Sequence, residues 1–485
     1  MSIENIKNDN RITSCHNNSV PNTIVTDELR ERHSATSSQT VSLSEKVNVT
    51  TTKDVACAKK DWSDHEHHLK YDDPEFGADK PSPTFDTEAT DGGYGWLVVL
   101  GTFMVQITSI MQDHYDLTMF RDSVPNSQFQ LSFVGTILEV FVNLMGPIAQ
   151  IIASRFGSTT VLILGTLMSV LGLELAGFSY EIWHLYLTQG VLFGAGASFL
   201  YVTAMSITPL WFDKNRGLAL GIASGGSGIG GLFLPFVITP LNSNLGAAWT
   251  YRILGFICLG CNIIACITIR EKKSSVKSKE ARTLKTIFRL DVLQDTNFLL
   301  WCLASVIGLM GYFVPYFFLP GYATYLGLSA TQGSTLIAVM SAANFIGRVL
   351  VGSIGDRIGR LNANIIFTFG SAFSNLFIWT FAHSFGVLVA YSVLFGLFCG
   401  AYFAMMTPIT AAILTPDQYS TGVSTLLLFN IISIFGITIS SSIETKSTAE
   451  PYFAYKMFTG VVYLTSAILL VLLKFKMAKG FMTKI

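Results

Sequence analysis

Charged residues are scarce in this sequence. Of its 485 residues, only 13% are Asp, Glu, Lys or Arg, whereas 50% are hydrophobic. The 32 basic and 32 acidic side chains leave no formal net charge, which argues against a nucleic-acid partner. Half of the acidic residues, 16 of 32, lie in residues 1–90, so the rest of the chain is more apolar than the average indicates. This composition excludes an ordinary soluble protein and favours one that crosses a membrane many times.

The sequence also lacks the patterns of metal and catalytic centres. Cys258, Cys261 and Cys266 share an apolar stretch that has no accompanying His or acidic cluster, which argues against a zinc site. The run HEHH at 65–68 has no second cluster of ligands and is interpreted as part of a solvated tail. The glycine run at 226–231 matches a dinucleotide fingerprint but lacks the preceding strand and the following acid. We therefore expect no enzyme activity, no cofactor and no metal.

Residues 1–90 are rich in Ser, Thr, Asn and Asp and show almost no apolar periodicity. Such a segment cannot bury enough apolar surface to offset its ordering entropy, so we expect a disordered tail that could bind regulatory partners. It contains no apolar core of the secretory type. Asn17 and Asn48 lie in glycosylation sequons, which matter only if the tail is outside the cell.

Twelve apolar stretches of spanning length follow this tail. They are expected at residues 95–112, 129–152, 158–177, 183–208, 217–240, 250–269, 298–320, 333–354, 362–382, 384–408, 419–442 and 455–473. A basic loop at 270–297 divides them into two groups of six. The sequence thus predicts an all-α membrane protein with two six-helix halves, at 91–269 and 298–475, and a short tail at 476–485.

The basic residues predict the orientation. If the amino terminus is cytosolic, the inner loops and carboxyl tail carry 17 Lys and Arg, whereas the outer loops carry 4. Both termini are therefore expected in the cytosol, and the two sequons are expected to be unused. The plasma membrane is the expected location, with the vacuolar or another internal membrane as the alternative.

An internal echo indicates duplication. SRFGS at 154–158 follows the second stretch, and GDRIGR at 355–360 follows the second stretch of the other half. These Arg-apolar-Gly turns are similar to the cytosolic turns that hold together the two halves of major facilitator superfamily transporters; the alternative is that any short cytosolic loop collects Arg and Gly. The resemblance implies a cytosolic gate at Arg155, Asp356, Arg357 and Arg360.

Two longer motifs resemble the signatures of the monocarboxylate transporter family. DGGYGW at 91–96 precedes the first stretch, and PLWFDKNRGLALGIASGGSGIGG at 209–231 leads from the fourth into the fifth. The resemblance covers about residues 91–475, and the long tail is similar to that of the fungal branch, which includes riboflavin transporters. Apart from any resemblance, the first motif suits a tight turn with membrane-anchoring rings, and the glycines of the second suit close helix packing. The motif residues are Asp91, Gly92, Gly93, Gly95, Trp96, Phe212, Lys214 and Arg216.

One arginine interrupts the apolar stretch at 333–354. Arg348 has seven uncharged residues on each side, and its guanidinium stays charged at ordinary pH. It lies about 12 Å along a helix from Asp356, so it is expected to remain below the membrane surface and to face a cavity or a partner. Its planar fork suits an anionic substrate. The alternative is a structural Arg tethered to a carbonyl or an acid.

The family resemblance implies an Asp one helical turn before this Arg, for proton coupling. The residue at that position is Asn344, whose amide cannot titrate. Either the protein is not proton-coupled or another acid takes that role. Glu139 is the candidate because it lies inside an apolar stretch, although a neutral Glu bonded to a neighbouring helix is an equal alternative. Glu174 is a second candidate.

The resemblance also implies a Lys late in the first helix, but no Lys occurs between Lys80 and Lys214. The first stretch is short before Asp113 and His114. In the superfamily, helices 1, 4, 7 and 10 line the cavity. The expected cavity residues, each with packing as its alternative, are Gln106, Tyr201, Tyr312, Tyr316 and Tyr402.

These observations predict an alternating-access transporter of a small organic anion similar to a monocarboxylate, with Arg348, Asn344 and the cavity residues in its binding site. Whether protons accompany the anion is open. Facilitated uptake of riboflavin or another vitamin is one alternative. A membrane nutrient sensor on a degenerate transport fold is another, favoured by Asn344 and the short first helix.

Overall fold

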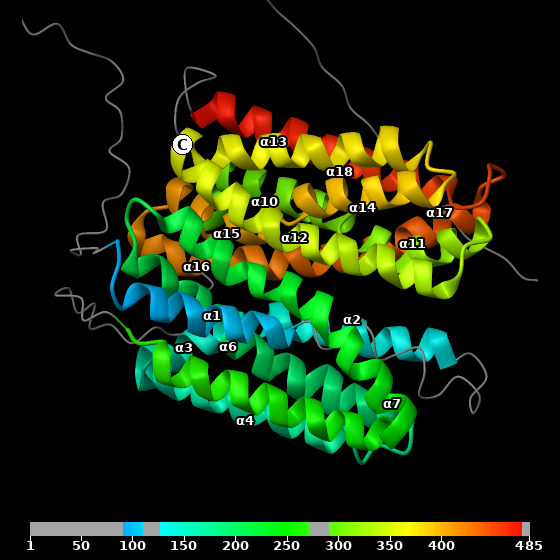
Figure 1. Cartoon of the computed structure of the whole chain (residues 1–485). Helices are drawn as coiled ribbons and strands as arrows, with labels where there is room; N and C mark the ends of the chain where they lie inside the picture. Colours follow the sequence, from blue (N-terminus) through cyan, green and yellow to red (C-terminus); the bar gives the residue numbers. More distant parts are fainter. Residues whose placement is uncertain (1–90, 110–126, 272–290, 478–485) are drawn as a thin grey trace, which may run out of the picture. The chain divides into compact units, whose positions relative to one another are not determined.

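The computed structural model describes residues 91–109, 127–271 and 291–477, and these residues form helices and no strand (Figure 1). The predicted tail at 1–90, Asp113, His114 and most of the central loop lie outside the described residues.

The first half contains α1 to α7, with one π-helical and one 3₁₀ segment. Their bounds are α1 Gly95–Ser109, α2 Ser127–Leu144, α3 Gly146–Phe156, α4 Ser158–Ala176, α5 Ile182–Leu185, η1 Tyr186–Phe193, α6 Gly194–Ile207, η2 Thr208–Trp211 and α7 Arg216–Thr268.

The second half contains α9 to α18. Their bounds are α9 Asp291–Gln294, α10 Thr296–Met310, α11 Phe313–Tyr325, α12 Ala330–Ile358, α13 Arg360–Phe373, η3 Ser374–Trp379, α14 Phe385–Cys399, α15 Ala401–Ile413, α16 Pro416–Asn430, η4 Ile431–Phe435, α17 Gly436–Lys446 and α18 Phe453–Met477. In Figure 1, α12 and α14 run side by side, as do α10 and α18.

As far as the described residues reach, each of the twelve predicted stretches falls on helical segments. Among the described residues, nine helices are long and apolar enough to cross a membrane, or ten if the bent pair α2–α3 counts as one span. The difference from twelve has two causes. Helix α7 breaks at Gly246, whose φ of 74° is outside the helical range, and so contains two predicted spans in two arms. Helix α1 has 15 residues and is shorter than a usual span.

The two echoing turns have the same backbone geometry. Gly157 ends α3 with φ of 87°, and Gly359 ends α12 with φ of 101°. A left-handed conformation favours glycine, which explains why each motif places Gly two residues after an Arg.

Glycines bring α7 of the first half against α12 of the second. A Cβ at Gly217 would lie 2.6 Å from the Gly352 carbonyl, and a Cβ at Gly228 would lie 2.8 Å from the backbone nitrogen of Phe345. These contacts occupy roughly the first 18 Å of α7, at the end that begins with Arg216. The glycine-rich motif therefore serves the close packing that its composition predicts.

Candidate functional site

Arg348 lies on α12 and is 3% exposed. Its Nη1 donates to the main-chain carbonyl of Ser224 on α7 at 2.8 Å, and its Nη2 donates to the Tyr312 hydroxyl at 3.3 Å. The guanidinium carbon lies 4.8 Å from the ring centre of Phe403 on α15, which is a cation–π contact. The charge is therefore held by one neutral carbonyl, one hydroxyl and an aromatic face.

This arrangement leaves part of the guanidinium unused. Within the described structure, the Nε of Arg348 is buried and has no hydrogen-bond partner. Gly400, between α14 and α15, adjoins it: a Cβ there would lie 2.9 Å from Nε and 2.7 Å from the Asn344 amide nitrogen. A buried, unpaired N–H on a charged group is costly, so it marks a place where an acceptor would be stabilising.

Aromatic rings surround the guanidinium. Tyr312 lies where the helix is interrupted between α10 and α11, and Pro315 follows in the first turn of α11. The Tyr312 ring lies 4.8 Å from that of Phe403 and 5.4 Å from that of Tyr316, centre to centre. Phe313 adds an edge contact at 4.9 Å. These distances are typical of attractive aromatic pairs, and Tyr312 meets both Phe403 and Phe313 edge-on. The rings thus form an apolar, aromatic wall beside a fixed positive charge.

Asn344 faces α14 and not the guanidinium. Its amide nitrogen donates to the Cys399 sulfur at 3.1 Å and to the Gly396 carbonyl at 3.4 Å, and the side chain is 1% exposed. Both partners are acceptors, so this position requires a donor, which an ionised Asp could not supply. At the position where the family resemblance implies a titratable acid, the Asn344 amide therefore donates a hydrogen bond to the Gly396 carbonyl.

Of the residues predicted from the first half, Tyr201 lies nearest to Arg348 in the contacts that the structure gives. Tyr201 on α6 packs against the core of the second half, and its hydroxyl is within electrostatic range of both Arg348 and Glu139. Glu139 on α2 is half-buried. Gln106 on α1 is buried against Gly226 of α7. Tyr201 therefore lies within electrostatic range of an acid of α2 and of the guanidinium of α12.

Tyr402 is turned away from this group. Its hydroxyl contacts the Ala304 carbonyl at 3.2 Å and the Ser466 hydroxyl, and its ring stacks on Trp301 at 5.8 Å. The predicted cavity residue therefore lies among α10, α15 and α18. Glu174 is also remote, at the end of α4, with one buried oxygen that has no hydrogen-bond partner among the described residues and with Arg252 in electrostatic range.

The predicted gate residues fall into two groups. The Asp356 carboxylate accepts from the backbone N–H groups of Gly217 at 2.8 Å and of Leu218 at 2.9 Å. It thereby links α12 to the amino-terminal end of α7, where a negative charge is stabilising. Arg360 is half-buried within range of Asp356, whereas Arg155 and Arg357 are exposed.

The two family-like motifs bind each other. The Asp91 carboxylate accepts from the backbone N–H groups of Asp213, Lys214 and Asn215 at 2.9 to 3.2 Å. Burial raises the pKa of Asp91, but these three hydrogen bonds and the nearby Lys214 charge together bring it below its ordinary value.

The rings of the two motifs interlock next to this carboxylate. The ring of Trp96 meets that of Phe212 at 5.1 Å, and a Cβ on Gly95 would lie 3.0 Å from the Phe212 ring. Gly92 and Gly93 form the turn before α1, and Arg216 donates from Nε to the Phe212 carbonyl at 3.1 Å. Asp91 and Asp356 together hold both ends of the 213–218 segment.

Comparison with known proteins decides the family. The sequence profile of the Major Facilitator Superfamily matches residues 95–374 and 302–480. The chain belongs to the major facilitator superfamily. It is a multi-pass membrane transporter of small molecules and not an enzyme, and the prediction of that fold from sequence is confirmed.

Relatives of this transporter match about four fifths of its length. It is 29% identical over 404 residues to an MFS-type transporter of Gibberella moniliformis, with 83% of this chain and 95% of that protein covered. It is 27% identical over 419 residues to the agnestins efflux protein AgnL12 of Paecilomyces divaricatus, with 84% and 92% covered. The solved fucose:proton symporter FucP of E. coli has the same fold, with a TM-score of 0.63, 16% sequence identity, and 78% of this chain and 98% of that chain covered.

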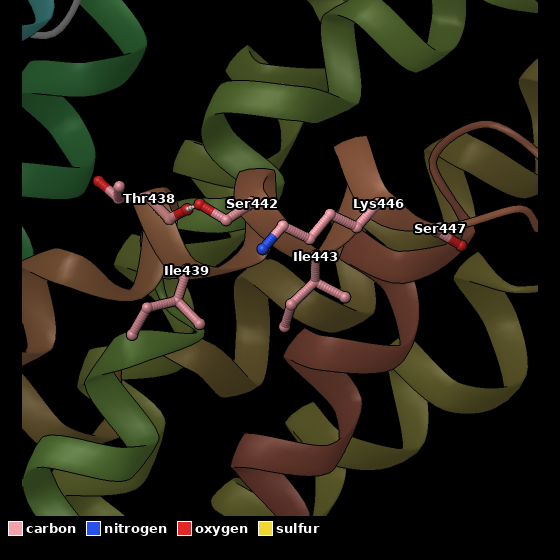
Figure 2. A pocket seen from close by; sticks show the side chains of 6 residues that line it. All are labelled: Thr438, Ile439, Ser442, Ile443, Lys446 and Ser447. Atoms are coloured by element: carbon pink, nitrogen blue, oxygen red, sulfur yellow. Dashed lines mark hydrogen bonds between the residues drawn. The ribbon is translucent and has the colours of Figure 1, made fainter. Parts of the chain in front are cut away.

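Among the described residues, a cavity that is open to the surface lies along α17, away from Arg348. It has a volume of about 550 Å³ and is lined by one face of that helix and the residue after it, namely Thr438, Ile439, Ser442, Ile443, Lys446 and Ser447. Figure 2 shows the Lys446 side chain running back along the helix toward Ser442, whose hydroxyl donates to the Thr438 carbonyl at 2.8 Å. This cavity lies at the end of α16–α17 opposite Tyr419, which shares a small pocket with Arg216. It is therefore on the side of the transporter opposite Asp356.

Three residues that contact the guanidinium or lie beside it were not predicted from the sequence. Ser224 contributes its main-chain carbonyl, for which its side chain gives no signal. Phe403 follows Tyr402 and lies against the guanidinium, whereas Tyr402 lies against α10. Gly400 is important because a side chain at this position would collide with Arg348. The only sequence signal for it is the run FCGAY, in which a glycine separates two apolar segments.

Proposed function

We propose that this transporter carries a small organic anion by alternating access, and that the carboxylate of this substrate binds Arg348. One observation carries the proposal: a buried guanidinium that is paired only with neutral groups and keeps an unpaired Nε. A carboxylate offers two oxygens to such a fork and forms stronger, charge-assisted bonds than a carbonyl does. This role agrees with the resemblance to monocarboxylate transporters.

The aromatic wall selects the body of the substrate. Tyr312, Tyr316 and Phe403 would contact a planar, conjugated group attached to the carboxylate. Benzoate is the simplest compound of this class. Asn344 supports the geometry of α12 and α14 around the site, and Gln106 and Tyr201 complete it from the first half. Tyr402 has a packing role.

Glu139 is the proposed proton carrier. Asn344 cannot titrate, and Tyr201 lies within range of both Glu139 and Arg348. A proton on Glu139 would change the field at the tyrosine hydroxyl beside the bound anion, which is a route for coupling the two.

The gate is proposed to be cytosolic and closed here. Asp356 holds the end of α12 to the start of α7, and Arg360 lies within electrostatic range of Asp356. Arg155 and Arg357 contribute the positive charge that orients the loops. The cavity along α17 would then be the outer vestibule, with both termini in the cytosol. The plasma membrane is the proposed location.

Three alternatives concern the direction of transport, the class of substrate and whether the substrate is moved at all. One transport experiment in proteoliposomes distinguishes them. The name of the relative AgnL12 describes efflux of agnestins, so export is tested together with import. Riboflavin would stack on the aromatic wall without needing Arg348. A nutrient sensor would bind a ligand without moving it.

The test is transport by the purified full chain in proteoliposomes, in both directions, with radiolabelled benzoate, its neutral analogue benzamide, and riboflavin. We expect saturable benzoate transport, no benzamide transport, and loss of benzoate transport in Arg348→Ala. Arg252→Lys is the matched control, because Arg252 also stacks on rings, Phe178 at 4.4 Å and Trp249 at 5.0 Å, but lies outside the site. Riboflavin transport that persists in Arg348→Ala would contradict the proposal.

A further inference from the structure

The bond between Arg348 and Ser224 joins the two halves of the transporter. Arg348 belongs to α12, and Ser224 belongs to the first arm of α7; they are 3% and 0% exposed. The Nη1–carbonyl distance is 2.8 Å. A Cβ at Gly221, one turn before Ser224, would clash with the Arg348 carbonyl, so the two backbones are in direct contact here.

The Ser224 carbonyl is an unusual partner for a charge. It lies within a helix, and it also accepts from the Ser227 hydroxyl at 3.1 Å. A neutral oxygen that is shared in this way forms a weaker bond with a guanidinium than a carboxylate would. A carboxylate has two oxygens, which can accept from Nη1 and Nη2 together. The guanidinium therefore has a better arrangement available, with two carboxylate oxygens in place of one carbonyl oxygen at Nη1.

We propose that the Ser224 carbonyl occupies the position that one oxygen of a substrate carboxylate takes. Substrate binding then breaks the bond between α7 and α12. This inference rests on the proposed function, because it requires an anionic substrate at Arg348.

The consequence is a link between binding and access. In the present arrangement the first part of α7 is held to α12 at two polar points: Asp356 at the end of the helices, and Arg348 near their middle. Substrate binding breaks the Arg348–Ser224 bond, so the closed cytosolic gate is weakened only when substrate is present. Empty transporter therefore opens the gate less readily than loaded transporter does. A ligand shifts such an equilibrium only through its different affinity for the two states, and the exchanged bond supplies that difference.

The outer cavity supplies a reporter of the closed gate. Ser442 is exposed on α17 and lines this cavity, so a cysteine at that position is open to a membrane-impermeant maleimide when the cavity faces outward (Figure 2). The rate of labelling of Ser442→Cys in proteoliposomes, after subtraction of the parent chain, measures the population of this state. Benzoate and benzamide are the two probes.

Three results are expected. Benzoate slows labelling of the Ser442→Cys protein by about tenfold, the equivalent of roughly 1.4 kcal/mol, and benzamide does not. Adding Arg348→Gln slows labelling to a similar degree without any ligand, because the bond is already absent, and benzoate then has no further effect. Adding Asp356→Asn, the matched control, also slows labelling but leaves a response to benzoate, because the exchanged bond is intact.

Two results would overturn the proposal. One is an unchanged labelling rate in Arg348→Gln. The other is an unchanged rate when benzoate is added to the Ser442→Cys protein, which needs no substitution at Arg348 and so keeps the test valid if that variant does not fold. Benzoate uptake in the same vesicles separates the two failures. Benzoate uptake without a change in labelling would rule out the exchange of hydrogen-bond partners at Arg348 but not the proposed transport function. Absence of both uptake and the labelling response would rule out both proposals.

Discussion

Gly400→Ala is the substitution that most sharply tests the position of the guanidinium. The backbone of Gly400 has φ of −79° and ψ of −1°, which alanine adopts without strain, so the effect comes from the added methyl group alone. That methyl would lie 2.7 Å from the Asn344 amide nitrogen and 2.9 Å from both Cγ and Nε of Arg348. Real Cβ contacts are not this short, so Arg348 or Asn344 must move.

The magnitude follows from the cost of overpacking. Inserting one methyl group into a packed site costs about 1–3 kcal/mol. If the guanidinium absorbs this by moving, the cost falls on substrate binding, and KM rises by about 5- to 150-fold. Folding stability is expected to change less, because alanine also lowers the conformational entropy of the unfolded chain.

The assay compares KM for benzoate transport and the melting temperature of purified protein. Gly386→Ala is the matched control: it lies in α14 of the same span, and a Cβ there would meet no atom within 4 Å. We expect wild-type KM in Gly386→Ala and a raised KM with nearly unchanged melting in Gly400→Ala. Equal KM values in the two variants would refute the claim that the guanidinium must occupy its present position.

Other predictions concern the proton, the motif and the topology. Glu139→Gln should abolish the pH dependence of transport while exchange of benzoate across the membrane continues; retained pH dependence would eliminate Glu139 as the proton site. Because the pKa of Asp91 is lowered by folding, its stabilisation is present above the ordinary value near 3.8 and is lost as pH falls through the lowered value. Asp91→Asn should therefore melt earlier than wild type at neutral pH, and the difference should vanish below that pKa. A tag on the amino terminus should resist protease added to intact cells, and cleavage would reverse the predicted orientation.

The fold could be predicted from sequence because its main determinants are one-dimensional. Long apolar stretches must be helical in a bilayer, since every backbone group has to be satisfied within its own segment. The similar Arg-apolar-Gly motifs at 154–158 and 355–360 then indicated two duplicated halves. The break at Gly246 could be placed only between the fifth and sixth stretches, because its position depends on how the two arms of α7 pack.

The site could be predicted only in part. Arg348 was identifiable because a charge inside an apolar stretch is rare, and Tyr312 and Tyr316 because of their place in the seventh stretch. Its partners were not, because they are a carbonyl, a ring on the opposite side of its helix from Tyr402, and a glycine. From the sequence, Arg348 could be either a substrate anchor or a structural residue tethered to a carbonyl. In the structure Arg348 is bonded to the Ser224 carbonyl. In the exchange proposed above, the same residue leaves this carbonyl and then binds the substrate, so it has both roles in turn.

Titration of benzoate into purified protein in a calorimeter measures whether Arg348 binds the anionic group of the substrate. We expect binding to wild type and to Arg252→Lys with equal affinity. We also expect at least about tenfold weaker binding to Arg348→Lys, which keeps the charge but loses the planar fork. Benzamide should not bind to any of the three. Benzoate binding of equal strength to Arg348→Lys and to wild type would contradict the account.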